Sequence, residues 1–159
     1  MSVAFTKEED SESAAADLPD RPISTHPNLV TPEGLALIDA ALAAARAAYA
    51  TAQSSDDVKS DRMAMARATR DLRYYGARRA SAQLVAAPAE PDRAAFGVTV
   101  TLEREDGRRQ TYRIVGEDEA DPARGSVSYF SPLAAAVLGK AIGDVALVAG
   151  KEVEVIGLA

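Results

Sequence analysis

The chain has 159 residues, enough for one or two small domains, and it is 47% hydrophobic but only 5% aromatic. Its formal net charge of −6 argues against free binding to duplex nucleic acid, because proteins that bind it usually carry a basic excess. The lack of cysteine excludes disulfides and thiolate metal sites, and the single His26 excludes a histidine metal cluster.

The N-terminal residues predict neither a membrane segment nor a folded element. No apolar run reaches the length of a membrane span, and the first twenty residues hold six acids against Lys7 alone, which is unlike a secretory signal. We therefore expect a cytoplasmic protein without membrane contact, with residues 1–29 as a disordered acidic tail that carries little to bury.

Residues 30–85 predict two amphipathic helices. Thr31 and Pro32 form a helix-start signal, and residues Ser54 to Arg62, "SSDDVKSDR", form a polar turn between the two helices. Residues on both sides of this turn recur with an alternating spacing of three and four. Before the turn they are Leu35, Ile38, Leu42, Ala45, Tyr49 and Ala52, and after it they are Met65, Ala68, Leu72, Tyr75, Arg79 and Ala82. This spacing predicts an antiparallel α-helical coiled-coil hairpin whose alanines allow close packing.

The second half of the chain predicts a small sheet. Residues 86–94 contain "AAPAEPD" and are expected to be a linker. In residues 95–159, alternating apolar residues at 98–103 indicate a strand, Asp106-Gly107 indicates a hairpin, and "QTYRIVG" and "SVSYF" are further strands. A short helix starts at Ser131-Pro132, and a last hairpin surrounds residues 149–151. The predicted class is α+β, a helical hairpin followed by a small antiparallel sheet.

Several of these stretches resemble a known family. They are "NLVTPEGLALI", "FGVTVTLEREDGRRQTYRIVGEDEAD" and "SVSYFSPLAAAVLGKAIGDVALV", which occur in this order over about residues 28–158. Their sequence and order resemble the bacterial Gre transcription elongation factors, GreA and GreB. The resemblance implies an FKBP-like C-terminal domain and a chain that acts on RNA polymerase, and we expect the chain to act as a monomer.

The resemblance also implies a mechanism. The C-terminal domain would dock at the polymerase secondary channel through Ser131, Pro132 and Leu133, with Tyr129 and Phe130 beside them. The hairpin would enter the channel, where Asp57 and Asp61 would help to hold a Mg²⁺ ion shared with the polymerase active centre. The polymerase would then cleave its own backtracked RNA, so the chain would be a cofactor rather than an enzyme and would need no intrinsic cofactor.

Three departures from the family pattern leave a second function open. The acids of the turn are spaced differently from those of the family, and each helical arm is about one heptad shorter, roughly 10 Å less reach at 1.5 Å per residue. Ala135 stands where related sequences usually place an arginine. The alternatives are a channel-binding regulator that does not stimulate cleavage, or an FKBP-like protein-interaction module.

The candidate residues also have purely structural interpretations. Asp56, Asp57 and Asp61 form either a solvated turn with helix-capping acids or a site for Mg²⁺. The basic strip of Arg67, Arg70 and Arg73 faces either nascent RNA and the channel walls or solvent, paired with the acidic tail. Ser131, Pro132 and Leu133 either contact the polymerase or only build the start of their helix. The acidic loop of Asp118, Glu119 and Asp121 is expected to be solvated rather than to bind a cation.

Overall fold

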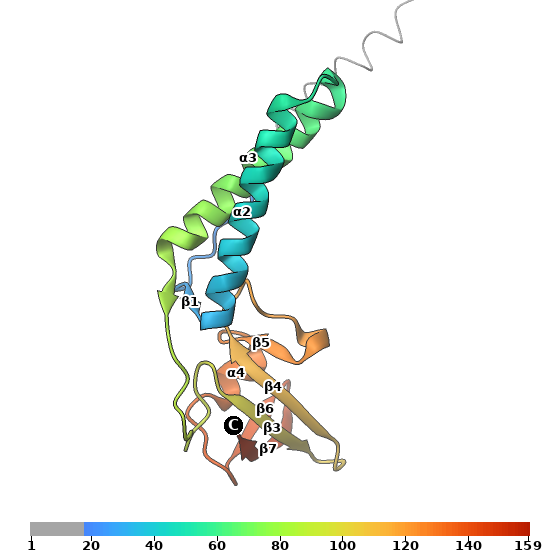
Figure 1. Cartoon of the computed structure of the whole chain (residues 1–159). Coiled ribbons are helices and arrows are strands. Elements are labelled where there is room, and N and C mark those ends of the chain that lie inside the picture. The colour runs from blue at the N-terminus through green and yellow to red at the C-terminus, as the bar shows by residue number, and fades with distance from the viewer. Residues whose placement is uncertain (1–17) are drawn as a thin grey trace, which may run out of the picture. The chain divides into compact units, whose positions relative to one another are not determined.

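The computed structural model describes residues 18–159, except for the side chains of residues 58–60, and shows an α+β protein (Figure 1). The chain divides into two compact units, which are described separately below. The first contains the described part of Met1–His26 together with Ile38–Ser81, and the second contains Pro27–Leu37 and Ala82–Ala159. The second unit therefore includes residues on both sides of the helices, whereas the sequence predicted consecutive domains at 30–85 and 95–159.

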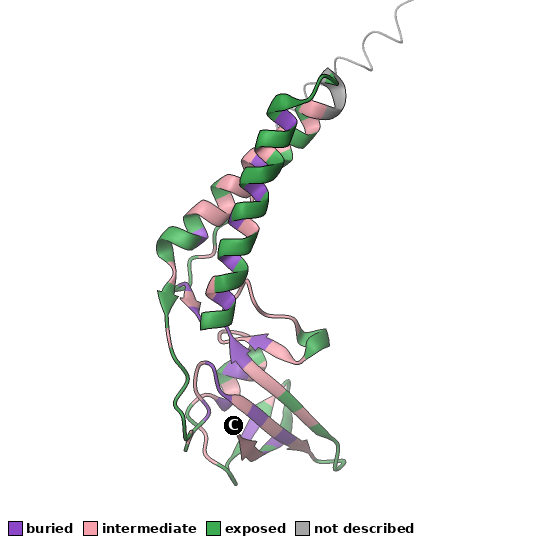
Figure 2. Ribbon diagram, viewed as in Figure 1, coloured by how far each residue is buried: buried purple, intermediate pink, exposed green. Residues whose placement is uncertain are grey.

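Two long helices form most of the first unit. Helix α2, Pro32–Ser54, and helix α3, Val58–Ser81, lie side by side in Figure 1 and are joined by residues 55–57. An ion pair of 2.6 Å joins Asp39, early in α2, to Arg79, late in α3. Buried positions recur as separate bands along the helices in Figure 2, and the apolar ones follow the predicted three-four spacing: Ile38, Leu42, Ala45, Ala52 and Ala68. The predicted spacing fails late in α3, where Arg78 is buried and the predicted Arg79 is exposed.

Helix α2 corrects one expectation about membranes. Its 23 residues are long and apolar enough to cross a membrane by length and composition alone. Alanine supplies much of this apolar character. This is weak evidence for a membrane span, because the core helix of a soluble protein meets the same criterion.

The N-terminal segment of residues 18–26 has no helix or strand, but it is anchored to α3. The Arg21 guanidinium lies 3.8 Å from the centre of the Tyr74 ring and 3.5 Å from a carboxylate oxygen of Asp71. Asp20 forms a 3.1 Å ion pair with Arg73. The prediction of a disordered tail is therefore wrong for residues 18–26. Arg21 contacts both an aromatic ring and a carboxylate of α3, and these contacts hold the segment in place. Residues 1–17 of that tail lie outside the described residues.

A five-stranded sheet forms the centre of the second unit, in the order β5-β4-β3-β7-β6. Its strands are β3, Thr99–Arg104; β4, Arg109–Val115; β5, Ser126–Ser128; β6, Val145–Val148; and β7, Lys151–Leu158. The predicted antiparallel order is correct except at β5, which runs parallel to β4. The connection between these two strands contains a short 3₁₀ helix, η1, at Pro122–Arg124, and it is long enough to bring the chain back beside β4 in the same direction.

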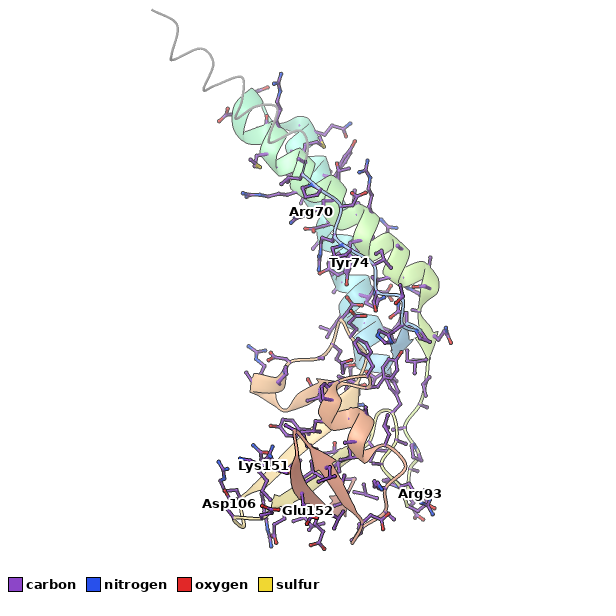
Figure 3. All side chains as sticks on the ribbon, turned by 180° about the vertical axis from the view of Figure 1, so that it is seen from behind. Arg70, Tyr74, Arg93, Asp106, Lys151 and Glu152 are labelled. Atoms are coloured by element: carbon purple, nitrogen blue, oxygen red, sulfur yellow. The ribbon has the colours of Figure 1, made fainter. Side chains whose placement is uncertain are left out.

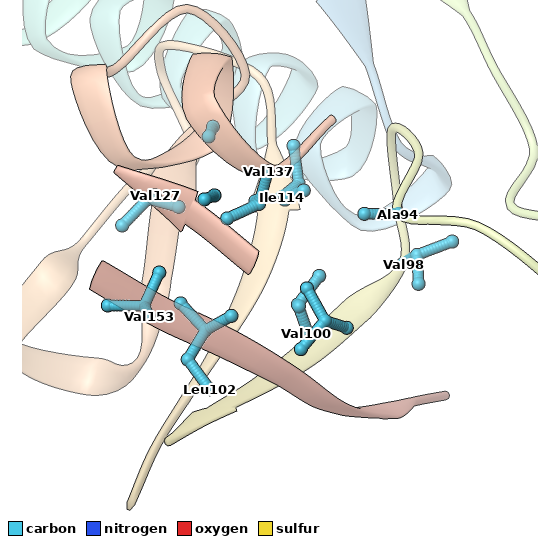
Figure 4. Close-up of a cluster of buried hydrophobic side chains, with 11 residues drawn as sticks. Ala94, Val98, Val100, Leu102, Ile114, Val127, Val137 and Val153 are labelled. Carbon is cyan, nitrogen blue, oxygen red and sulfur yellow. The ribbon is translucent and has the colours of Figure 1, made fainter. Parts of the chain in front are cut away.

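Helix α4, Pro132–Val137, packs against the sheet through Ala134 and Val137. These side chains share one core with valine, leucine and isoleucine residues of the strands (Figure 4). The buried strand residues are Val98 just before β3, then Val100, Leu102, Ile114, Val127, Ala146, Val153 and Val155. The core is therefore built from small branched side chains, as the low aromatic content requires.

A two-residue parallel pair completes the second unit. Strand β1, Leu29–Val30, lies beside β2, Gln83–Leu84, immediately before α2 and after α3. The sequence did not predict this pair, because two-residue strands leave no alternation to detect. Residues 86–94, the predicted linker, contain no helix or strand, but Ala94 is buried in the core.

Candidate functional site

The turn between α2 and α3 places Asp57 immediately before the first residue of α3. Its carbonyl oxygen accepts the backbone N–H of Asp61 at 3.0 Å, the first bond of the helix, and its own N–H donates to Ser55 Oγ at 3.4 Å. Asp56 and Asp57 are exposed, and Asp61 lies in the first helical turn. Carboxylates at these positions are favoured by the helix dipole, so the capping interpretation has a structural basis.

Asp61 also lines a hollow of about 650 Å³ within the first unit. Ala52 and Met65 contribute apolar surface to this hollow, and Arg62 and Arg70 contribute guanidinium groups. Within the described part of the chain, no group of three or more acidic, histidine or cysteine side chains could hold a metal ion. Oxygen ligands suit Mg²⁺, and Asp57 and Asp61 supply carboxylate oxygens at the start of α3.

The predicted basic strip is not uniform. Arg73 pairs with Asp20 of the N-terminal segment, and Arg70 Nε lies 3.7 Å from Asp71 Oδ1 without a hydrogen bond (Figure 3 labels Arg70). Arg67 is exposed, and no ion pair is found for it among residues 18–159 as described. Asp20 therefore neutralises the charge of Arg73. This agrees with the interpretation in which the basic strip pairs with the acidic tail.

The segment at the start of α4 is held by internal contacts. The Ser131 hydroxyl accepts the N–H of Ala134 at 3.2 Å, Pro132 begins the helix, and Leu133 packs against the core. The Tyr129 hydroxyl donates to the carbonyl of Pro27 at 2.7 Å, and its ring lies edge-on to that of Phe130. The five residues predicted to bind a polymerase thus lie together. Each also has an internal contact or helix-start role, so its presence can be explained without a partner.

A buried network ties the start of α2 to the acidic loop after β4. Thr31, 1% exposed, accepts the N–H of Gly34 at 2.9 Å and donates to the Glu119 carboxylate at 2.5 Å. Arg113 lies 3.2 Å from Glu33 and 3.8 Å from Glu119. The expectation that Glu119 is solvated is therefore wrong. The sequence indicated Thr31 as a helix-capping residue. It gave no sign that Thr31 also contacts Glu119, which lies 88 residues further along the chain.

Charge also acts on Glu33 in this network. Its own backbone N–H and the Arg113 guanidinium hold the pKa of the Glu33 carboxyl below its ordinary value. Asp121, another acid of the predicted loop, has local contacts. Asp121 forms a 3.5 Å ion pair with Arg124, and its backbone N–H donates to Ser126 Oγ at 2.8 Å. The loop is therefore organised by internal contacts.

The C-terminal half of the chain is similar to known proteins. Residues 88–157 match the family model "Transcription elongation factor, GreA/GreB, C-term". The chain is 41% identical over 90 residues to transcription elongation factor GreA of Desulfovibrio desulfuricans, covering 55% of this chain and 54% of that protein. It is 55% identical over 53 residues to GreB of Pseudomonas aeruginosa, covering 33% and 32%.

A solved structure is also similar. The crystal structure of GreA factor homolog 1 (Gfh1) of Thermus thermophilus is 20% identical, with a TM-score of 0.40, and the match covers 84% of this chain and 99% of that one. The chain matches only about half, or about a third, of the length of the curated relatives named above. Over residues 88–157, the chain is therefore similar to the C-terminal domain of the GreA/GreB transcription elongation factors.

Proposed function

We propose that this chain acts on bacterial RNA polymerase in the cytoplasm as a transcription elongation factor. The observation that carries the proposal is the GreA/GreB family match over residues 88–157, preceded by two long helices with exposed acids at their turn. Immobilised core polymerase should retain the full chain at micromolar concentration. Absence of retention under low-salt conditions would contradict the proposal.

The finer arrangement is part of the same proposal. The second unit acts as an FKBP-like domain that docks at the polymerase secondary channel, with the surface around Tyr129 and Phe130 as its contact. Helices α2 and α3 act as an antiparallel coiled-coil hairpin and carry the turn into the channel, beside nascent RNA. The chain works as a monomer and supplies no active site of its own.

Cleavage stimulation depends on the acids of the turn. Asp57 and Asp61 lie one helical turn apart, so both can approach an ion at the polymerase active centre and add oxygen ligands to it. Any Mg²⁺ would be shared with the polymerase. If this is the function, combined Asp57→Asn and Asp61→Asn changes abolish the stimulated cleavage of backtracked RNA while binding persists.

The matched control for that assay is Asp56→Asn, which removes an exposed acid of the same turn. Stimulated cleavage should persist in the control variant. If the double variant cleaves as well as the unmodified chain, the proposed role of Asp57 and Asp61 is wrong. A control variant as inactive as the double variant would point to the charge of the turn rather than to two specific ligands.

A second candidate function is regulation without cleavage. The length of the helices favours this function. At 1.5 Å per residue, 23 and 24 residues give arms of about 35 Å, and short arms reduce how far the acids of the turn can reach toward the polymerase active centre. This function is also favoured by the helix-start position of Asp57. Under this function the chain competes with a cleavage-stimulating factor for the polymerase, and the unmodified chain lowers cleavage in the same assay. A protein-interaction module that ignores polymerase is the remaining alternative, which the retention experiment tests.

A further inference from the structure

Strand β6 is an edge of the sheet with an unusual exposed surface. Among residues 18–159 it pairs only with β7, because it stands last in the strand order. Val145 and Leu147 are 49% and 65% exposed, whereas Ala146 between them is buried in the core. Ile142, just before the strand, is 62% exposed. Proteins normally protect an edge strand with lysine, proline or a covering loop, and β6 itself has no lysine or proline.

The backbone of the same two residues also faces outward. The Asp144 carbonyl accepts the N–H of Val155 in β7 at 2.9 Å. Because hydrogen bonding alternates along an antiparallel pair, Ala146 and Val148 also bond toward β7, whereas Val145 and Leu147 direct their N–H and C=O groups away from it. The turn of Ala149 and Gly150, both with positive φ, fixes this register. Val145 and Leu147 thus present apolar side chains together with backbone N–H and C=O groups that pair with no strand in the described part of the chain.

Carboxylates lie beside this apolar edge. Glu154 and Glu152 of β7 stand directly across from Val145 and Leu147. Both are exposed, and no ion pair or hydrogen bond of their side chains is found within the described part of the chain. A hollow of about 250 Å³ next to Val145 is lined by four glutamates and one arginine: Glu103, Glu105, Glu152, Glu154 and Arg104. Figure 3 shows Glu152 and Lys151 at this end of the sheet.

We infer that β6 is a docking edge for an extended partner segment that alternates basic and apolar residues. Such a segment would add a strand beside β6 through the backbone groups of Val145 and Leu147. Lysine or arginine stems would lie over these two side chains, and their charged ends would reach the glutamates. A second copy of this chain fits less well, because it would cover the apolar residues but leave the glutamates without a counter-charge. This surface is separate from the residues proposed to contact the polymerase.

The test uses the full chain and a short blocked peptide that alternates lysine and valine. Fluorescence anisotropy should show binding that weakens as salt rises, and a matched peptide with glutamate in place of lysine should not bind. Amide exchange measured by NMR should slow at Val145 and Leu147 when the lysine peptide is present. Failure of the lysine peptide to bind, or equal binding of the glutamate peptide, would overturn the inference.

Two variants separate the backbone and the charge contributions. Leu147→Pro removes an outward N–H and the exposed leucine side chain without breaking the bonds to β7, so circular dichroism should be unchanged while affinity falls by at least about tenfold. Glu152→Gln with Glu154→Gln should weaken binding by about tenfold and flatten its salt dependence. The charge-matched control, Glu90→Gln with Asp92→Asn, alters two exposed acids of the connection before β3 and should leave affinity unchanged.

Other outcomes count against the inference. Unchanged peptide affinity in a folded Leu147→Pro variant would exclude strand addition at this edge. Equal weakening in the Glu90 and Asp92 control would show that the peptide responds only to net charge. If sedimentation shows a dimer of the unmodified chain that Leu147→Pro dissociates, the occupant of the edge is a second copy rather than a basic segment.

Discussion

At the scale of single residues, two helical glycines have opposite surroundings. A methyl group at Gly34 would lie 2.6 Å from Glu119 Oε2 and 3.3 Å from Thr31 Oγ1, whereas one at Gly76 would meet nothing within 4 Å. Gly34→Ala therefore displaces the Glu119 carboxylate and should lower the free energy of unfolding by about 1–2 kcal/mol, despite the better helix propensity of alanine.

Gly76→Ala is the matched control for this prediction. It adds the same methyl group in an open position of α3, so it should raise the free energy of unfolding by about 0.5–1 kcal/mol. Urea unfolding of both variants, followed by circular dichroism, measures the two effects. A stabilising Gly34→Ala change would show that the Glu119 side chain moves aside freely and that the network does not constrain the start of α2.

At the scale of elements, the segment of residues 18–26 depends on Arg21. The guanidinium lies against Tyr74 and ion-pairs with Asp71, and a hydrogen bond with Tyr75 raises the Arg21 pKa above its ordinary value. Arg21→Lys keeps the charge but loses the flat surface that stacks on a ring. We expect Arg21→Lys and Arg21→Ala to release the segment to similar extents, seen as faster amide exchange in residues 18–26.

The control for Arg21 is Arg46→Ala, which removes an exposed arginine of α2. Exchange in residues 18–26 should be unaffected by this control. If Arg21→Lys leaves the exchange rates unchanged while Arg21→Ala raises them, charge alone anchors the segment and the stacking on Tyr74 contributes little. If neither variant changes exchange, Asp20 and Arg73 are sufficient to hold it.

Elements with a strong local pattern could be predicted from the sequence, and elements that depend on distant partners could not. The apolar spacing around Ile38 and Leu42 predicted α2, and Ser131-Pro132 predicted the start of α4, because these signals lie within a few residues. The parallel placement of β5 depends on the path of the connection between β4 and β5, and the contact of Thr31 with Glu119 joins residues 88 positions apart. The open edge at β6 required the strand order, which the alternation of Val145 and Leu147 does not contain.

At the scale of the whole molecule, the two compact units have different cores. The first buries mainly alanine, with Ile38 and Leu42 as its large apolar side chains, whereas the second buries branched residues of four strands around α4. Burial of apolar surface is the main stabilising contribution to folding, so we expect the helical unit to unfold at lower denaturant concentration than the sheet unit. The chain should then show two transitions rather than one.

Two core substitutions test this expectation. Leu42→Ala should cost about 2–3 kcal/mol and shift the first transition, which circular dichroism at the helical band follows. Val100→Ala should cost about 1–3 kcal/mol and shift the second transition, followed by amide exchange in β3 and β7. Leu84→Ala, at a position 59% exposed, serves as the control and should change either transition by less than about 0.5 kcal/mol. If Leu42→Ala shifts helix and sheet signals together, the two units unfold as one cooperative body, because the shared start of α2 couples them.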